Sequence, residues 1–176
     1  MGRGSSKAGG GSIKSETPIE TYEKSIYKSD QEHAIIITSD GQTIKFDTGD
    51  ENHVFGNEED IKKMNGGTAT HNHPNDSIFS ETDVGNGIAK GNLKEMRIVT
   101  KSGEIHVLEN NTESIDQRRA FSANYRNQIM KATNNVNARR KRGESVDKIE
   151  YTKMFMQNWL LNHAQDYGMS YKKKRI

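Results

Sequence analysis

Two histidines one residue apart, His71 and His73, are followed by a serine and an aspartate three residues apart, Ser80 and Asp83. Along a β-strand, residues two apart point to the same face, so both imidazoles can aim at one point while Asn72 points away. Imidazole and carboxylate groups bind zinc, and three such ligands leave the fourth position of a tetrahedral ion open to water. The spacing therefore predicts that His71, His73 and Asp83 bind a catalytic zinc ion.

Neither half of this pattern is specific by itself. An isolated His-x-His pair occurs by chance in strands, and Ser-x-x-Asp is close to an ordinary helix-capping pattern. The prediction rests on the two halves together, with Pro74 ending the strand between them. A zinc hydrolase also needs a base that does not bind the metal. Glu32, directly before an apolar run, is the candidate, although an exposed glutamate at a strand end is the simpler interpretation of that residue alone.

The composition narrows the chemistry and the fold. The chain has 176 residues and no cysteine, so a metal must be held by imidazole and carboxylate, and a nucleophile must be water or a hydroxyl. With 31% hydrophobic and 28% charged residues, we expect one domain of modest core with extensions. No apolar run approaches a membrane span and the N-terminus lacks a secretory signal, so we expect a cytoplasmic protein.

The pattern of apolar and turn residues predicts an α/β (α+β) domain over residues 17–112, after a disordered N-terminal arm at residues 1–16. The elements expected in it follow the order ββαβαββ. They are a hairpin around Asp40-Gly41, a short helix capped by Asn57, a strand over "TATHNH", a helix from Ser80 to Lys90, and a hairpin around Ser102-Gly103.

Residues 113–176 are predicted to form a basic helical extension of two helices with apolar stripes. We expect these helices to pack on each other or on the sheet, and they could also contact a partner protein or a second copy of the chain. Two basic clusters, at residues 139–142 and 172–175, could contact nucleic acid phosphates. A run of charges is more often a solvated end, so nucleic-acid binding is the weaker expectation.

At these residues the chain resembles the JAMM (MPN+) zinc metalloprotease superfamily. The family motif is an upstream Glu, then His-x-His-Pro, a short spacer and Ser-x-x-Asp, and the resemblance covers roughly residues 30 to 110. It implies that His71, His73 and Asp83 bind Zn²⁺, that Glu32 is the general base and then the acid, and that Ser80 helps stabilise the oxyanion. It also implies the JAB/MPN fold, a mixed sheet flanked by helices and similar to that of cytidine deaminases, and a peptidase or isopeptidase that acts on a protein or peptide.

The resemblance is to bacterial and phage members of the family. Five residues, 75–79, separate the proline from the serine where eukaryotic members have six, and Glu32-His33 before a β-run is similar to RadC-type proteins. The alternative to an enzyme is therefore a non-catalytic phage or mobile-element interaction module. An HNH nuclease is disfavoured, because that site spreads its His, Asn and His over a ββα unit.

Overall fold

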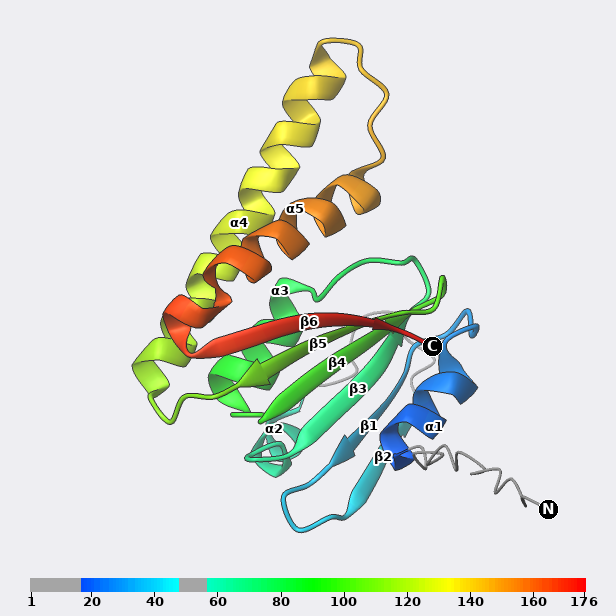
Figure 1. Cartoon of the computed structure of the whole chain (residues 1–176), viewed down its shortest axis with the longest axis vertical. Coiled ribbons are helices and arrows are strands. Elements are labelled where there is room, and N and C mark those ends of the chain that lie inside the picture. Colours follow the sequence, from blue (N-terminus) through cyan, green and yellow to red (C-terminus); the bar gives the residue numbers. More distant parts are fainter. Residues whose placement is uncertain (1–16, 48–56) are drawn as a thin grey trace, which may run out of the picture.

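The computed structural model describes residues 17–47 and 57–176, so the expected arm at residues 1–16 lies outside the described residues. Its centre is a six-stranded mixed sheet in the order β2-β1-β3-β4-β5-β6 (Figure 1). Only β3 and β4 pair in parallel among these neighbours. The strands are β1 (His33–Ile37), β2 (Thr43–Asp47), β3 (Thr68–His73), β4 (Glu95–Thr100), β5 (Glu104–Asn110) and β6 (Met169–Arg175). The α/β class with a mixed sheet and flanking helices is confirmed.

The elements expected from the sequence are present between β1 and β5. Both hairpins form, and α2 (Glu58–Lys63) begins at Asn57, whose side chain accepts a hydrogen bond from the Asp60 amide. The helix expected from Ser80 to Lys90 is a single α-turn, α3 (Glu81–Asp83), followed by a wider π-helix, η1 (Val84–Lys90). A Cβ on Gly87 would lie 2.9 Å from the Met96 sulfur, so a glycine lets η1 pack closely on β4.

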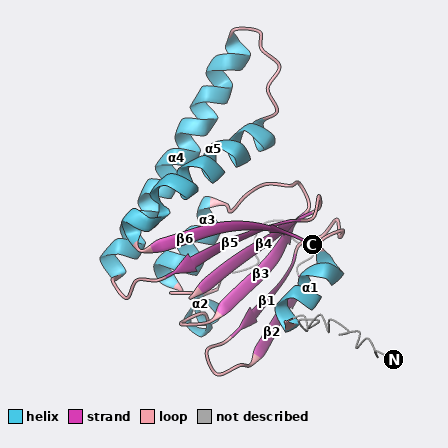
Figure 2. Cartoon of the chain, viewed as in Figure 1, coloured by secondary structure: helices cyan, strands magenta, loops and turns pink. Residues whose placement is uncertain are grey.

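Two elements lie outside the predicted order (Figure 2). The helix α1 (Pro18–Ile26) precedes β1, and its N-terminus is a capping box between Thr17 and Glu20. At the other end, the expected helical extension is wrong for residues 169–175, which form β6 and pair antiparallel with β5. The left-handed Gly168, with φ of 72°, ends the preceding 3₁₀-helix η2 (Ala164–Tyr167) and turns the chain into this strand.

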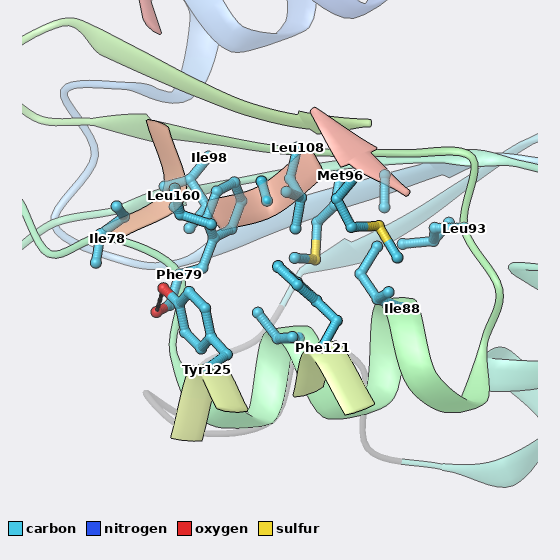
Figure 3. Packing of buried hydrophobic residues seen from close by; sticks show 14 of the residues in the cluster. Ile78, Phe79, Ile88, Leu93, Met96, Ile98, Leu108, Phe121, Tyr125 and Leu160 are labelled. Atoms are coloured by element: carbon cyan, nitrogen blue, oxygen red, sulfur yellow. Dashed lines mark hydrogen bonds between the residues drawn. The ribbon is translucent and has the colours of Figure 1, made fainter. Parts of the chain in front are cut away.

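The sheet buries a different set of side chains on each face. On one face, residues from β4 and β5 pack against η1 and the two long helices α4 (Ile115–Lys141) and α5 (Lys148–His163). Figure 3 shows this layer, in which Ile88, Phe121, Tyr125 and Leu160 meet the strand residues Met96, Ile98 and Leu108. The opposite face carries a smaller apolar cluster against α1, formed by Ile26, Val99, Ile105 and Val107.

A buried ion pair fixes α1 to the second face. Arg97 of β4 donates to both carboxylate oxygens of Glu23, over 2.6 and 2.8 Å, and the Thr70 hydroxyl donates to one of them over 2.9 Å. Glu23 is fully buried, so these hydrogen bonds replace the water that its charge loses. Because Thr70 lies next to His71 in β3, this cluster also supports the strand that bears both histidines.

The two long helices form a hairpin whose distal turn extends beyond the β6 edge of the sheet (Figure 1). The expected packing on each other and on the sheet domain is present, through buried Phe121 and Tyr125 of α4 and Leu160 of α5. The predicted stripes are only partly buried, since Ile115 and Met154 are 45% and 61% exposed. Within residues 17–47 and 57–176, no helix has the length and apolarity to cross a membrane.

Candidate metal centre

The side chains of His71, His73 and Asp83 converge at the end of β3. The two histidine Nε2 atoms lie 2.8 Å apart, and the Asp83 carboxylate oxygens lie 3.4 Å from Nε2 of His71 and 3.6 Å from Nε2 of His73. Both imidazoles are buried, at 1% and 5% exposure, and Asp83 is partly buried. The three residues offer ligand atoms close enough together to hold one metal ion.

The spacing of these ligand atoms suits a tetrahedral ion. Ligands at bonds of about 2.05 Å from zinc stand about 3.3 Å apart in a tetrahedron. The observed separations of 2.8, 3.4 and 3.6 Å fall on both sides of that value. Two nitrogen atoms that face each other with lone pairs repel unless a proton or a cation lies between them. The residues present therefore fit a cation with three protein ligands and at least one open position.

Hydrogen bonding to Ser77 orients the His73 ring so that its Nε2 can accept a metal ion. Its Nδ1 donates to the Ser77 carbonyl over 3.0 Å and also lies 2.9 Å from the Ser77 hydroxyl. A proton on Nδ1 leaves the lone pair on Nε2, the nitrogen that faces Asp83. Burial, followed by the charge of His71, lowers the pKa of His73 to about 4, so this imidazole is neutral at pH 7.

The other two ligands are electrostatically coupled. Burial by itself lowers the pKa of His71, but the charge and hydrogen bond of Asp83, together with the charge of Glu32, raise it above 6.5. Burial acts to raise the pKa of Asp83, yet the two histidines and the Ser80 amide hold it well below its usual range. Because a histidine binds a metal in its deprotonated form, a metal ion at this centre would compete with a proton for His71.

Ser80 positions Asp83 through a reciprocal capping box. The Ser80 hydroxyl accepts from the Asp83 amide over 3.0 Å, and the Ser80 amide donates to the Asp83 carboxylate over 2.7 Å. The hydrogen bond from the Tyr125 hydroxyl to the Phe79 carbonyl, 2.7 Å long, ties the preceding residue to α4 (Figure 3). Ser80 is exposed, so its hydroxyl is also accessible to a substrate.

Asn72, between the two ligands, holds the segment that contains Glu32. Its side chain points to the other face of β3, where its oxygen accepts from the His33 amide over 2.7 Å. Its nitrogen donates to the Gln31 carbonyl over 2.9 Å and to the Ser29 carbonyl over 3.4 Å. These bonds bracket Glu32, which is partly buried and close enough for its charge to raise the pKa of His71. The structure thus brings His71, His73 and Asp83 together with Ser80 as the cap of Asp83, and it places Glu32 near enough to interact electrostatically with His71.

Sequence reasoning missed three residues that support this centre. Ser77 orients His73, Asn72 holds the Glu32 segment, and Tyr125 anchors the loop before Ser80. The polar turn after Pro74 was a weak signal for Ser77. Tyr125 is 46 residues from its partner along the chain, and no local spacing points to that contact.

The two basic clusters form ion pairs with carboxylates of this chain. Arg139 and Arg142 contact Glu144 at the distal turn of the hairpin, at 2.6 and 3.0 Å. In β6, Lys172 pairs with Glu109 and Lys173 lies 3.2 Å from Glu104. These contacts account for part of the positive charge within the fold, and nucleic-acid binding stays a prediction.

No protein-family model, curated protein or solved structure matches the chain in the three comparisons.

Proposed function

We propose that this chain is a zinc-dependent peptidase or isopeptidase of the JAMM type, with the JAB/MPN fold. The observation that carries the proposal is the convergence of three buried or partly buried ligand atoms from His71, His73 and Asp83, with the carboxylate of Glu32 within electrostatic reach. Two nitrogen ligands and one oxygen ligand form a typical catalytic zinc set. When bound, zinc supplies a Lewis acid and lowers the pKa of a water molecule towards ~7.

The roles of the chain's own residues follow from their positions. His71 and His73 would hold the ion through the Nε2 atoms that face each other, and Asp83 would hold it through a carboxylate oxygen. Glu32 accepts a proton from the attacking water and delivers it to the leaving amine. Ser80 keeps Asp83 in place and offers its hydroxyl proton to the oxygen of the attacked carbonyl. The substrate is the amide bond of a protein or peptide.

Metal content is the first test. We expect protein purified without added metal to contain about one zinc per chain by mass spectrometry, and His71→Ala to lose it. His106→Ala is the matched control, because His106 is equally buried but is not among the three ligands. A wild-type protein that carries no zinc and gains no stability from added zinc would falsify the proposal.

Cleavage is the second test. Glu32→Gln should keep its zinc and lose at least about a hundredfold in turnover of a peptide library or of ubiquitin-like conjugates, since general base catalysis contributes ~10²–10⁴. Equal turnover by this variant would show that the reaction does not use Glu32.

A second candidate is a non-catalytic interaction module, which the surface of the helical hairpin favours. Met154 and Leu161 are 61% and 60% exposed and lie seven residues apart in α5, so they are on the same side of that helix, where apolar side chains can contact a partner protein or a second copy. Leu161→Asp would then abolish binding to the partner protein or to the second copy, whereas Glu32→Gln would preserve that binding.

A further inference from the structure

A pocket of about 360 Å³ lies between the metal-site loop and the helical hairpin. One wall is formed by residues 77–81, the segment between His73 and Asp83. The opposite wall is formed by Ile129 of α4 and by Ile149 and Thr152 of α5. Its volume is at the lower end of ligand pockets, which span roughly 300–1,000 Å³. The size fits one or two large side chains.

The pocket adjoins the segment that links His73 to Asp83, although none of the three candidate ligands lines it. Ser77, at one end of this wall of the pocket, hydrogen-bonds His73, and Ser80, near the other end, caps Asp83. Ser77 and Ser80 thus belong both to the lining of the pocket and to the support of two candidate ligands. Ile78, Phe79, Ile129 and Ile149 make the lining mainly apolar.

Two polar groups of the lining also point to a peptide ligand. The Thr152 hydroxyl is buried and has no hydrogen-bond partner among the described residues, and such a group commonly finds its partner in a ligand or water. Lys148 is exposed and forms no ion pair with the part of the chain that the structure describes. The other charged groups of the lining are paired, Glu81 with Arg126 and Lys153 with Glu104 and Glu150. The uncompensated charge is positive.

We infer that this pocket is the specificity subsite of the metal centre, and that it binds a bulky apolar side chain of a peptide substrate with a carboxylate close by. The inference rests on the proposed function, and it assigns the substrate class of that site. The hairpin thereby selects the substrate, while the sheet and the loop supply the ligands and the base.

The test is a peptide library cleaved by the zinc-loaded full chain, with the products read by mass spectrometry. We expect Leu, Met, Phe or Trp to be preferred over Gly at one position by about tenfold or more, as for a side chain that fills an apolar pocket. Ile149→Trp fills the pocket and should remove this preference. Met154→Trp is the matched control on the same helix, where it does not line the pocket, and should leave the preference unchanged.

The charge of the mouth is tested in the same library. We expect an acidic residue beside the apolar one to be favoured by about two- to fivefold, the range of an exposed ion pair, and Lys148→Gln to remove that advantage. A wild-type protein indifferent to acidic residues would overturn this half of the inference.

Two results separate the subsite from the activity. If the wild type cleaves peptides without an apolar preference, or if Ile149→Trp keeps that preference, the subsite is wrong and the peptidase stands. If no peptide is cleaved, binding is measured instead. Fluorescence anisotropy compares the affinity of the zinc-loaded Glu32→Gln protein for a Leu-containing peptide with its affinity for the Gly counterpart. Selective binding that Ile149→Trp removes supports the subsite without the peptidase, and the absence of selective binding overturns both.

Discussion

Replacing Asn72 by alanine should slow the reaction while leaving the metal bound. The Asn72 side chain makes three hydrogen bonds to the backbone on both sides of Glu32, and none of them involves a metal ligand's side chain. The change should therefore loosen the segment of Glu32, the proposed general base, and leave the Nε2 and carboxylate groups of the candidate ligands where they are.

The size of the effect follows from the lengths of these bonds. Two of them, at 2.7 and 2.9 Å, are of full strength, and the third, at 3.4 Å, is weak. At about 0.5–1.5 kcal/mol net for each good bond, the variant should lose about 1–3 kcal/mol of unfolding free energy. A displacement of about 1 Å at a catalytic group can cost ~10² in rate. We therefore expect turnover to fall between about tenfold and a hundredfold.

The matched control is Asn110→Ala. Asn110 lies at the end of β5, is 8% exposed, and also makes three hydrogen bonds, to Asn92, to the Leu93 carbonyl and from the Thr112 amide. Urea unfolding should show a similar loss of stability in both variants, while peptide turnover should fall only in Asn72→Ala. Zinc content should remain near one per chain in both.

Two results would refute this reasoning. Equal loss of turnover in Asn110→Ala would mean that stability alone explains the effect. Loss of zinc from Asn72→Ala would mean that Asn72 supports the ligands of β3 instead of the Glu32 segment.

Three further predictions concern the surroundings of the centre. Tyr125→Phe removes the hydrogen bond to the Phe79 carbonyl and should cost about 1–3 kcal/mol in urea unfolding, because it leaves a buried acceptor unpaired; an unchanged midpoint would show that water replaces the hydroxyl. Arg97→Met should cost about 3–5 kcal/mol, since Glu23 stays buried without its cation, and a loss below about 1 kcal/mol in the same assay would contradict this. Burial lowers the pKa of His106 from 6.5 to about 4. Between these two pH values the unfolded chain binds a proton that the folded chain does not. The free energy of unfolding should therefore be highest above about pH 6.5 and fall by about 3 kcal/mol as the pH decreases to about 4. His106→Gln should flatten the pH dependence of unfolding of the metal-free protein in this window, and an unchanged slope would refute the assignment.

The convergence of the three candidate ligands could be predicted because it depends on short-range geometry. Alternation along one strand places His71 and His73 on the same face, and the capping pattern places Asp83 in the first turn of the next helix. Their positions need only a strand, a turn and a helix start, and the sequence signals each of them locally.

The remaining features depend on contacts between distant segments or on signals that were present but missed. The helix α1 begins with a capping box, Thr17 to Glu20, which is visible in the sequence. The strand β6 could not be recognised from the sequence, because a run of lysines is typical of a solvated tail. The structure shows that Lys172 and Lys173 form ion pairs with Glu109 and Glu104 of the neighbouring strand. The contact of Asn72 with the backbone of residues 29–33 spans about 40 residues, so only the folded chain reveals it.

Strand β6 brings the chain back to the sheet next to the point where it left at the end of β5. Asn110 and Met169 are paired neighbours in the sheet, so residues 111–168 leave and re-enter the fold at one place. The far end of this excursion, near Ile149, can therefore change in length or sequence without shifting the register of any strand. In the proposed function, the hairpin wall of the pocket and the three candidate metal ligands therefore lie in different stretches of the chain, and only residues 77–81 contribute to both the pocket and the metal centre.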